Sequence, residues 1–581
     1  MPDASFSATT LAEQLDPLFH AALGRQMASL SRAGLLQAGS DWALHLAASP
    51  GKCLDLVRLA LHQNTEMQQY AQACMARSLA PQAPDAVPAP MQDRRFADPQ
   101  WQQWPFNVLS QSFLLTERWW EAATHGVWGV EKHHEDVVAF VARQFLDVFS
   151  PGNQLPTNPV VLQRTLAEGG ANLLRGASNA AEDFQRQALG EPPAGAEAFT
   201  VGRDVGTTPG KVVLKNRMME LIQYTPTTAT VHPEPILLVP AWIMKYYILD
   251  LSPHNSLIRY LVEQGHTVFC ISWLNPGAAD RDLGMDDYLD EGFHAALDAV
   301  AAIVPGQRVH AAGYCLGGTL LAIAAAAMAR DGDDRLATTT LLAAQTDFTE
   351  PGELALFIDE AQLSLLEAQM QQAGYLRADQ MAGAFQMLRS YDLLWSRMVN
   401  EYLLGDRAPM NDLMAWNADA TRMPAKMHSQ YLRRLFLNND LSQGRYPVGG
   451  RPVHLGDLHA PTFMVGTVTD HVAPWRSVYK LHRLSPAEIT FVLTSGGHNA
   501  GIVNPPGNPR RHFQMLTRAD HGHPIASEEW LHTAPETQGS WWPAWQQWLA
   551  AHSSARTKPP RMGLAQHPPL ADAPGSYVLV K

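Results

Sequence analysis

A glycine-rich stretch with a cysteine at its centre limits the fold of this chain more than any other feature. The run HAAGYCLGGTLLA, from His310 to Ala322, begins with small and apolar residues and continues into an Ala- and Leu-rich segment. Cys315 lies between the two parts, and Gly313 and Gly317 flank it where a side chain would prevent close packing. The pattern predicts a strand, a sharp turn and a helix, with Cys315 as a nucleophile at the tip of the turn.

Short β-branched runs precede and follow this turn. They include KVVLKN, MELIQY, PILLVP and HTVFCISW before it, and LATTTLLAA, APTFMVG and AEITFVLTS after it. Buried strands that alternate with helices indicate a mostly parallel, doubly wound sheet. With the nucleophile turn at its centre, this sheet is typical of the α/β-hydrolase fold.

The rest of the chain is helical in pattern. Residues 1–80 predict a variable helical segment, the proline-rich stretch 81–90 a stiff linker, and residues 91–200 a helical amino-terminal domain. The α/β-hydrolase domain is expected over 201–581. Within it, strand-like runs stop between about 347 and 455, which predicts a helical cap inserted between two strands of the sheet.

Composition excludes several classes of protein. With 46% hydrophobic and 17% charged residues among 581, the chain can bury a large core, and its net charge of -13 argues against a nucleic-acid binder. The start of the sequence lacks the features of a signal peptide, and the most apolar helical stretch, 320–329, is too short to span a bilayer. A cytoplasmic protein without a transmembrane segment is expected. The few, widely spaced cysteines suggest neither disulfides nor a zinc site, and the three outside the turn are expected to be structural: Cys53, Cys74 and Cys270.

A cysteine nucleophile needs a base, and the base needs a third group to orient it. Asp470 follows the strand-like run APTFMVG, and His498 follows AEITFVLTS within a glycine-rich loop. This gives the order nucleophile, acid, histidine that α/β-hydrolases use. His471 is the competing base, but its place beside Asp470 favours a supporting role.

The second donor of an oxyanion hole is expected in the loop of ILLVPAWIMKYYILDL. We predict that the Leu316 and Ile243 backbone N–H groups hold the oxyanion, with Trp242 as the alternative to Ile243. The position of Asp250, in the same stretch, slightly favours an ordinary acid at the start of a helix over a role in the site.

Two clusters could in principle hold a metal, but solvated helix and loop residues are the preferred interpretation, and no metal is expected. They are His133, His134, Glu135 and Asp136, and the pair His521 and His523.

Many motifs in one order resemble those of the polyhydroxyalkanoate synthases, closest to the class I type, over about residues 91–581. They include DRRFADPQW, PAWIMKYYILDLSP, GYCLGGTLL, TDFTEPGELALFIDE, WNADATRMPAKMHSQYLR, DHVAPW, GGHNAGIVNPP and APGSYVLVK. The resemblance implies that Cys315 is acylated, that His498 activates it, and that Asp470 assists. It also places Asp250 and His471 at motif positions near the site.

The resemblance further implies an acyltransferase that polymerises short-chain (R)-3-hydroxyacyl-CoA and needs no cofactor. It also implies a homodimer that binds the growing polyester chain and granule-associated proteins at the granule surface. Three residues depart from the usual family pattern and put acyl-chain preference and rate in question: Met244, Leu274 and Asn499. The alternatives are a thioesterase or polyester depolymerase of the same fold, and a non-catalytic granule-associated protein.

Overall fold

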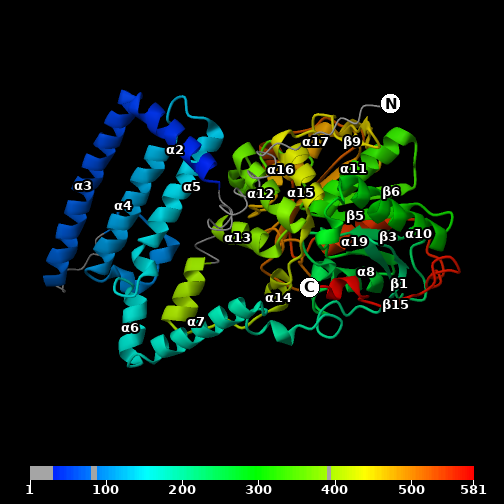
Figure 1. Cartoon of the computed structure of the whole chain (residues 1–581), viewed down its shortest axis with the longest axis horizontal. Coiled ribbons are helices and arrows are strands. Elements are labelled where there is room, and N and C mark those ends of the chain that lie inside the picture. The colour runs from blue at the N-terminus through cyan, green and yellow to red at the C-terminus, as the bar shows by residue number, and fades with distance from the viewer. Residues whose placement is uncertain (1–30, 80–87, 389–393) are drawn as a thin grey trace, which may run out of the picture. The chain divides into compact units, whose positions relative to one another are not determined.

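The structure is a computed structural model that describes residues 31–79, 88–388 and 394–581 (Figure 1). The described chain forms two compact units. The sheet unit comprises Gly195–Ala382 and Met410–Lys581, and the helical unit comprises the described part of Leu30–Ala194 together with Gly383–Pro409. Residues 1–30 of the predicted amino-terminal segment and most of the predicted linker lie outside the described residues.

An 11-stranded sheet forms the centre of the sheet unit (Figure 1). Its strands follow in the order β14 (Glu536–Gln538), β13 (His512–Arg518), β12 (Ile489–Thr494), β11 (Thr462–Thr467), β6 (Leu336–Leu342), β5 (Val309–Tyr314), β3 (Ile236–Val239), β4 (Val268–Trp273), β2 (Met219–Tyr224), β1 (Gly210–Lys215) and β15 (Ala571–Asp572). Neighbours from β12 to β4 pair in parallel, whereas the strands at both edges pair antiparallel. The predicted α/β fold is therefore confirmed with a parallel centre, while the antiparallel edges make the sheet as a whole mixed.

Helices cover both faces of this sheet, and for this reason its central strands are buried at every position. One hydrophobic core contains α10 (Ala295–Ile303) and α11 (Leu316–Asp331). The other contains α8 (Leu257–Glu263) and α19 (Trp542–Ala551). Shorter helices of the same unit are α9 (Met285–Asp287), the π-helix η7 (Tyr288–His294), α16 (Trp475–Tyr479), α17 (Leu481–Leu484) and α18 (Ser527–Thr533).

Between β6 and β11 the chain is mainly helical, as the sequence pattern predicts. It forms α12 (Glu360–Ala373), α13 (Ala378–Leu388), η10 (Met398–Leu403), α14 (Asp412–Ala418), α15 (Ala425–Tyr431) and η11 (Leu432–Leu437). Two small pairings were not predicted, because each of their strands has only two residues: β7 (Tyr375–Leu376) with β8 (Met423–Pro424), and β9 (Pro447–Val448) with β10 (Arg451–Pro452).

The helical unit contains α2 (Arg32–Ala47), α3 (Pro50–Leu79), α4 (Phe106–Thr124), α5 (Lys132–Val148), α6 (Pro159–Ala167) and α7 (Ala171–Leu189). Its small aromatic core is built on Phe96, Trp101 and Phe113. Beside this core the Arg95 guanidinium binds the carboxylates of Asp93 and Glu117. In the described ranges, none of the helices is long and apolar enough to span a bilayer.

Candidate active site

Cys315 occupies a strained turn between β5 and α11. Its backbone has φ 53° and ψ -124°, a region that side-chain-bearing residues rarely adopt. The tight turn depends on glycine: a Cβ at Gly317 would lie 2.0 Å from the Val239 carbonyl oxygen, and one at Gly313 would lie 2.4 Å from the Gly318 Cα. These contacts explain why the sequence holds glycine on both sides of the cysteine.

Asp470 follows the carboxyl end of β11, and its carboxylate is buried and fully bonded. Oδ1 accepts hydrogen bonds from the Val472 and Ala473 backbone N–H groups at 2.9 and 2.8 Å. Oδ2 accepts one from the Thr467 hydroxyl at 2.9 Å. Burial alone would raise the pKa of Asp470, but His498 and these donors outweigh burial and lower that pKa below its usual value. Asp470 is therefore a carboxylate at neutral pH.

His498 follows the carboxyl end of β12, and its Nδ1 lies 2.8 Å from Asp470 Oδ2. The Cys315 thiol lies close enough to this imidazole for its charge to act on the pKa of His498. Burial disfavours the imidazolium, but the charges of Asp470 and Cys315 outweigh that penalty and raise the pKa of His498 well above its usual value. The structure thus places Cys315 near His498 and binds His498 to Asp470, while their role as a catalytic triad stays a prediction. Such an array can activate a thiol nucleophile and shuttle its proton.

The predicted oxyanion donors lie at two loop ends. Leu316 is the first residue of α11, where a backbone N–H has no partner within the helix. Ile243 follows β3 and packs against the same hydrophobic core as Cys315. Their role as an oxyanion hole stays a prediction.

The loop that carries Ile243 is held through its carbonyl groups. The Thr421 hydroxyl donates to the Trp242 carbonyl oxygen at 2.6 Å, and the Thr421 N–H donates to that of Ile243 at 3.4 Å. The Trp416 indole N–H donates to the Lys245 carbonyl oxygen at 2.8 Å. Because these bonds occupy carbonyl oxygens only, they fix the loop without using its N–H groups.

Asp250 and His471, the predicted supporting residues, have partners of their own. Asp250 is fully buried and accepts hydrogen bonds from the hydroxyls of Thr208 and Ser256 at 2.5 and 2.6 Å. The helix cap expected at Asp250 is instead Ser256, whose Oγ accepts from the Arg259 N–H at the start of α8. The backbone carbonyl of His471 accepts from the Glu353 N–H.

The first cluster of residues considered as metal ligands belongs to the helical unit. His134 Nδ1 lies 2.8 Å from the Asp41 carboxylate, and Glu135 binds Lys132. In the described part of the chain, no group of three or more His, Cys, Asp and Glu side chains has a geometry that could hold a metal ion. His521 and His523 are exposed.

Sequence reasoning missed Thr467 and Tyr314 near the predicted triad, and it noted Asn499 only as a departure from the family pattern. Thr467 bonds Asp470, and its place at the last position of β11 could have indicated this. Tyr314 packs its ring 5.6 Å from that of His498 and donates its hydroxyl to Asn499. Their positions next to Cys315 and His498 were the available signal.

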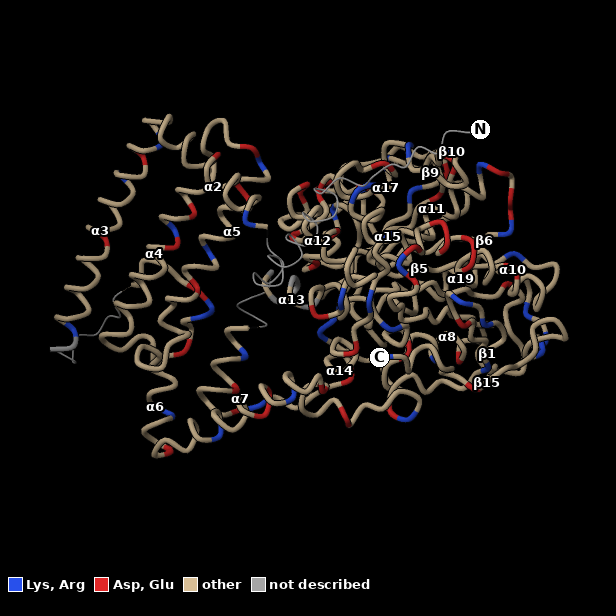
Figure 2. Tube along the Cα trace, viewed as in Figure 1, with Lys and Arg blue, Asp and Glu red and all other residues tan. Residues whose placement is uncertain are grey.

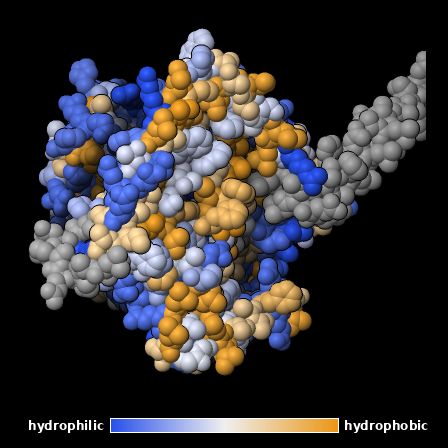
Figure 3. All heavy atoms as spheres, turned by 90° about the vertical axis from the view of Figure 1, so that its left-hand side faces the viewer, coloured by the Kyte–Doolittle hydropathy of each residue, from blue (hydrophilic) through white to orange (hydrophobic). Residues whose placement is uncertain are grey.

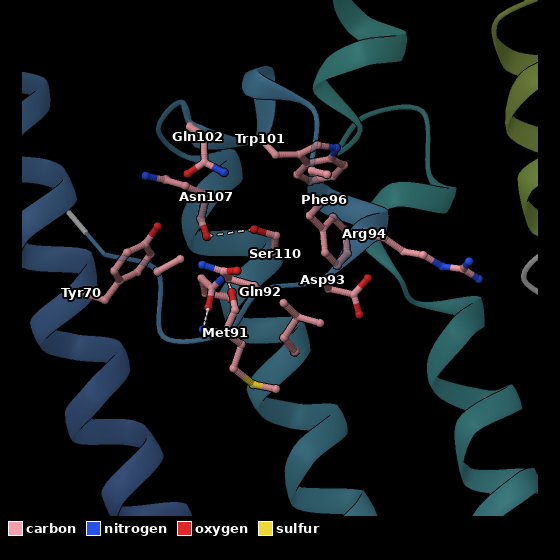
Figure 4. Close-up of a pocket in the computed structure, with 14 residues that line it drawn as sticks. Tyr70, Met91, Gln92, Asp93, Arg94, Phe96, Trp101, Gln102, Asn107 and Ser110 are labelled. Atoms are coloured by element: carbon pink, nitrogen blue, oxygen red, sulfur yellow. Dashed lines mark hydrogen bonds between the residues drawn. The ribbon is translucent and has the colours of Figure 1, made fainter. Parts of the chain in front are cut away.

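The helical unit contains a separate pocket of about 490 Å³ (Figure 4). Tyr70, Trp101 and Asn107 help line it, and no member of the triad does. Several polar groups around it bond one another: Gln111 exchanges two hydrogen bonds with the Met91 backbone, and the Ser110 hydroxyl donates to the Asn107 carbonyl. This pocket is not part of the candidate active site.

Comparisons with known proteins identify the family of the chain. The family model described as "Poly-beta-hydroxybutyrate polymerase N-terminus" matches residues 92–261, and the one described as "alpha/beta hydrolase fold" matches residues 234–505. A third, "Poly-beta-hydroxybutyrate polymerase N terminal", matches residues 10–52, where sequence reasoning found no motif.

Three relatives match most of the chain. The poly(3-hydroxyalkanoate) polymerase of Methylorubrum extorquens is 42% identical, covering 90% of this chain and 87% of the relative. Polymerase subunits from Rhizobium meliloti (strain 1021) and Cupriavidus necator are 41% and 37% identical, covering 87% and 94% of this chain and 83% and 93% of the relatives. The resemblance that the motifs carry is therefore confirmed, and the chain belongs to the poly(3-hydroxyalkanoate) polymerase family.

Proposed function

We propose that this protein polymerises (R)-3-hydroxyacyl-CoA into polyhydroxyalkanoate through a thioester on Cys315. The observation that carries the proposal is the placement of Cys315 near His498, which binds Asp470, at the carboxyl edge of an α/β-hydrolase sheet. The names of the relatives support the choice of reaction. The resemblance to class I enzymes supports a short-chain substrate such as 3-hydroxybutyryl-CoA.

Acylation exchanges one thioester for another. His498 takes the proton of Cys315, and the thiolate attacks the acyl carbon of the substrate. The bond from Cys315 Sγ to that carbon forms, the bond to the CoA sulfur breaks, and His498 returns the proton to the leaving CoA thiolate. The Leu316 and Ile243 N–H groups stabilise the oxyanion in between.

Elongation transfers the acyl group to an alcohol. The 3-hydroxyl of another monomer or of the chain loses its proton to His498 and attacks the acyl carbon. An oxygen ester forms, the bond to Sγ breaks, and the proton passes to the thiolate. Asp470 supports this step because its carboxylate stabilises the imidazolium.

Sulfur suits this reaction better than oxygen. A thioester on Cys315 keeps the activation of the acyl-CoA nearly unchanged, so the later attack by an alcohol stays favourable. A serine would form an oxygen ester at once and leave little driving force for the ester bonds of the polymer. Water must be excluded in both steps, and we assign that role to the helical segment between β6 and β11.

The rival reaction is hydrolysis, in which water completes the turnover, as in a thioesterase or depolymerase. Incubation with 3-hydroxybutyryl-CoA separates the two. We expect CoA release together with insoluble polymer, whereas free 3-hydroxybutyrate as the main product would replace the proposal with hydrolysis. A non-catalytic granule-associated protein would release no CoA.

The protein is proposed to work in the cytoplasm, at the surface of polyester granules. The exposed surface of the helical unit supports such a contact. Large apolar side chains are exposed there, among them Leu54, Leu61, Trp128, Phe145 and Phe149. Figure 3 shows apolar side chains gathered in patches on the face that it draws, and Figure 2 shows long uncharged stretches along α3 and α4. Apolar patches of this kind are typical of contact surfaces. The family resemblance implies two further partners for such a surface: a second copy of the chain in a homodimer, and the granule-associated proteins.

A further inference from the structure

Tyr314 and Asn499 are the immediate chain neighbours of the nucleophile and of the base. Tyr314 is the last residue of β5 and precedes Cys315, and Asn499 follows His498 in the loop after β12. The Tyr314 hydroxyl donates to Asn499 Oδ1 at 2.6 Å. One side-chain hydrogen bond therefore joins the two loops that carry the reacting pair.

The Tyr314 hydroxyl depends on this acceptor. The residue is 3% exposed, so that solvent has little access to replace a lost partner. Burial, with the charges of Cys315 and Asp470, raises the pKa of Tyr314 well above its usual value, and the hydroxyl keeps its proton as a donor. The hydroxyl can therefore donate its proton to Asn499 Oδ1, as it does in the structure.

The Asn499 end is fixed by its own loop. The Asn499 carbonyl oxygen accepts from the Ile502 and Val503 N–H groups at 3.1 and 2.9 Å. Two buried indoles at the start of α19 hold the next turn: Trp541, the N-cap residue, donates to the Gly501 carbonyl, and Trp542 donates to that of Ile502, both at 2.9 Å. Asn499 therefore presents its amide oxygen from a rigid support.

His498 lies between these two fixed ends. Asp470 holds its Nδ1, and the Tyr314 ring packs against the imidazole with centroids 5.6 Å apart and planes 31° apart. The carboxylate fixes one nitrogen but leaves the imidazole free to tilt about that bond. The tyrosine ring lies where it limits this tilt, and its hydroxyl is bonded to Asn499.

We propose that Tyr314 and Asn499 form a clasp that positions His498 against Cys315. Neither residue touches the reacting atoms, and both act through the imidazole. The residue at 499 was noted in the sequence as a departure from the family pattern, and the clasp gives it a role: it supplies the acceptor that an apolar side chain could not.

A double-mutant cycle tests the clasp, using Tyr314→Phe, Asn499→Leu and the double variant. We expect each single change to lower kcat for CoA release about tenfold, since either one removes the clasp. KM should change by less than about twofold. The double variant should be no slower than the slower single variant, because one bond is lost in all three.

Tyr479→Phe is the matched control. Its hydroxyl also donates one hydrogen bond, to the backbone carbonyl of Ile525, and it lies in a different part of the core. We expect this variant to keep kcat within about twofold of the unchanged protein. The clasp is overturned if Tyr314→Phe behaves like Tyr479→Phe, or if the losses of the two single variants multiply in the double variant.

The measurement of CoA release in the clasp variants rests on the proposed function. A second measurement needs no substrate. The rate at which iodoacetamide alkylates Cys315 at pH 7, followed on the Cys315 peptide by mass spectrometry, reports how well His498 serves the thiol. We expect it to fall in the three clasp variants and to stay unchanged in Tyr479→Phe; equal alkylation in all would contradict the clasp. If the unchanged protein releases no CoA while alkylation follows this pattern, the proposed reaction fails and the clasp stands.

Discussion

At the residue scale, the nucleophile turn leaves no space at Gly317. A Cβ there would lie 2.0 Å from the Val239 carbonyl oxygen and 2.6 Å from that of Pro240. Both atoms belong to the backbone, so the turn itself must move to accept a methyl group. The position of Cys315 above the sheet thus depends on a residue that takes no part in the chemistry.

We predict that Gly317→Ala lowers the free energy of unfolding by about 1–3 kcal/mol, as overpacking does, and lowers the rate of CoA release at least tenfold. Thermal unfolding and a thiol-release assay measure the two effects. Gly277→Ala is the control, because a Cβ there meets only Asp280 Oδ2 at 3.9 Å. A Gly317→Ala protein with unchanged melting temperature and rate would show that the turn can relax.

Asp470→Asn should separate the two half-reactions. The thiol is an intrinsically good nucleophile, and we expect Cys315 still to be acylated. The alcohol is a far weaker acid and needs the stronger base that the Asp470 carboxylate provides, so elongation should fall by about 10²–10⁴-fold. Rapid quench compares the first release of CoA with polymer growth. Equal loss of both steps would contradict this separation and show that acylation depends on the Asp470 carboxylate as much as elongation does.

The sequence order of Cys315, Asp470 and His498 predicted the triad because each follows a strand, and parallel strands end at one edge of a sheet. The Tyr314–Asn499 bond could not be predicted in this way. Its geometry depends on how two loops are fixed beside each other. The sequence of one loop does not indicate where the other loop lies.

At the element scale, a buried lysine helps to hold the segment that follows β15. The Lys245 ammonium, which is 4% exposed, donates to the Val578 carbonyl at 2.7 Å and to the Val580 carbonyl at 2.6 Å. Burial lowers the pKa of Lys245 to about 8. Since Lys245 belongs to the loop after β3, these bonds tie that loop to residues far along the chain.

We predict that Lys245→Met lowers the free energy of unfolding by about 1–3 kcal/mol, because it leaves the buried Val578 carbonyl without this donor. Lys211→Met is the control: its partner Asp572 is exposed, and exposed pairs contribute less than about 1 kcal/mol. Chemical denaturation measures both. Equal stability of the two variants would show that the carbonyl finds another donor.

The strands of the sheet were predictable to the extent that they are apolar. The runs MELIQY and AEITFVLTS stand out because β2 and β12 are buried at every position. By contrast, β13 is only partly buried and carries polar residues, and β14 and β15 have three and two residues. Pairing with a neighbouring strand stabilises these edges, and single-sequence patterns do not report pairing.

At the scale of the whole molecule, neutral histidines are buried in the sheet unit. His266 is fully buried, stacks on His232 with centroids 4.7 Å apart, and neither of its ring nitrogens has a hydrogen-bond partner among the described residues. Burial lowers the pKa of His266 to about 3 and that of His310 to about 4. Their contribution to stability is full above about pH 6.5, the usual histidine pKa, and is lost as the pH falls toward 4.

We therefore predict that the melting temperature falls between pH 7 and pH 5, and that His266→Phe makes this fall smaller. Differential scanning fluorimetry across this range measures it. The exposed His523→Asn should keep the slope of the unchanged protein. A His266→Phe protein with the full slope would assign the acid sensitivity to other groups.

The most direct test of the whole account is to identify the atom that carries the acyl group during turnover. The protein is mixed with 3-hydroxybutyryl-CoA, quenched in acid within the first turnovers, digested and examined by mass spectrometry. The account predicts one or more hydroxyacyl units on the peptide that contains Cys315, and none in Cys315→Ala. Polymer formed by Cys315→Ala, or an acyl group found on any other residue, would contradict it.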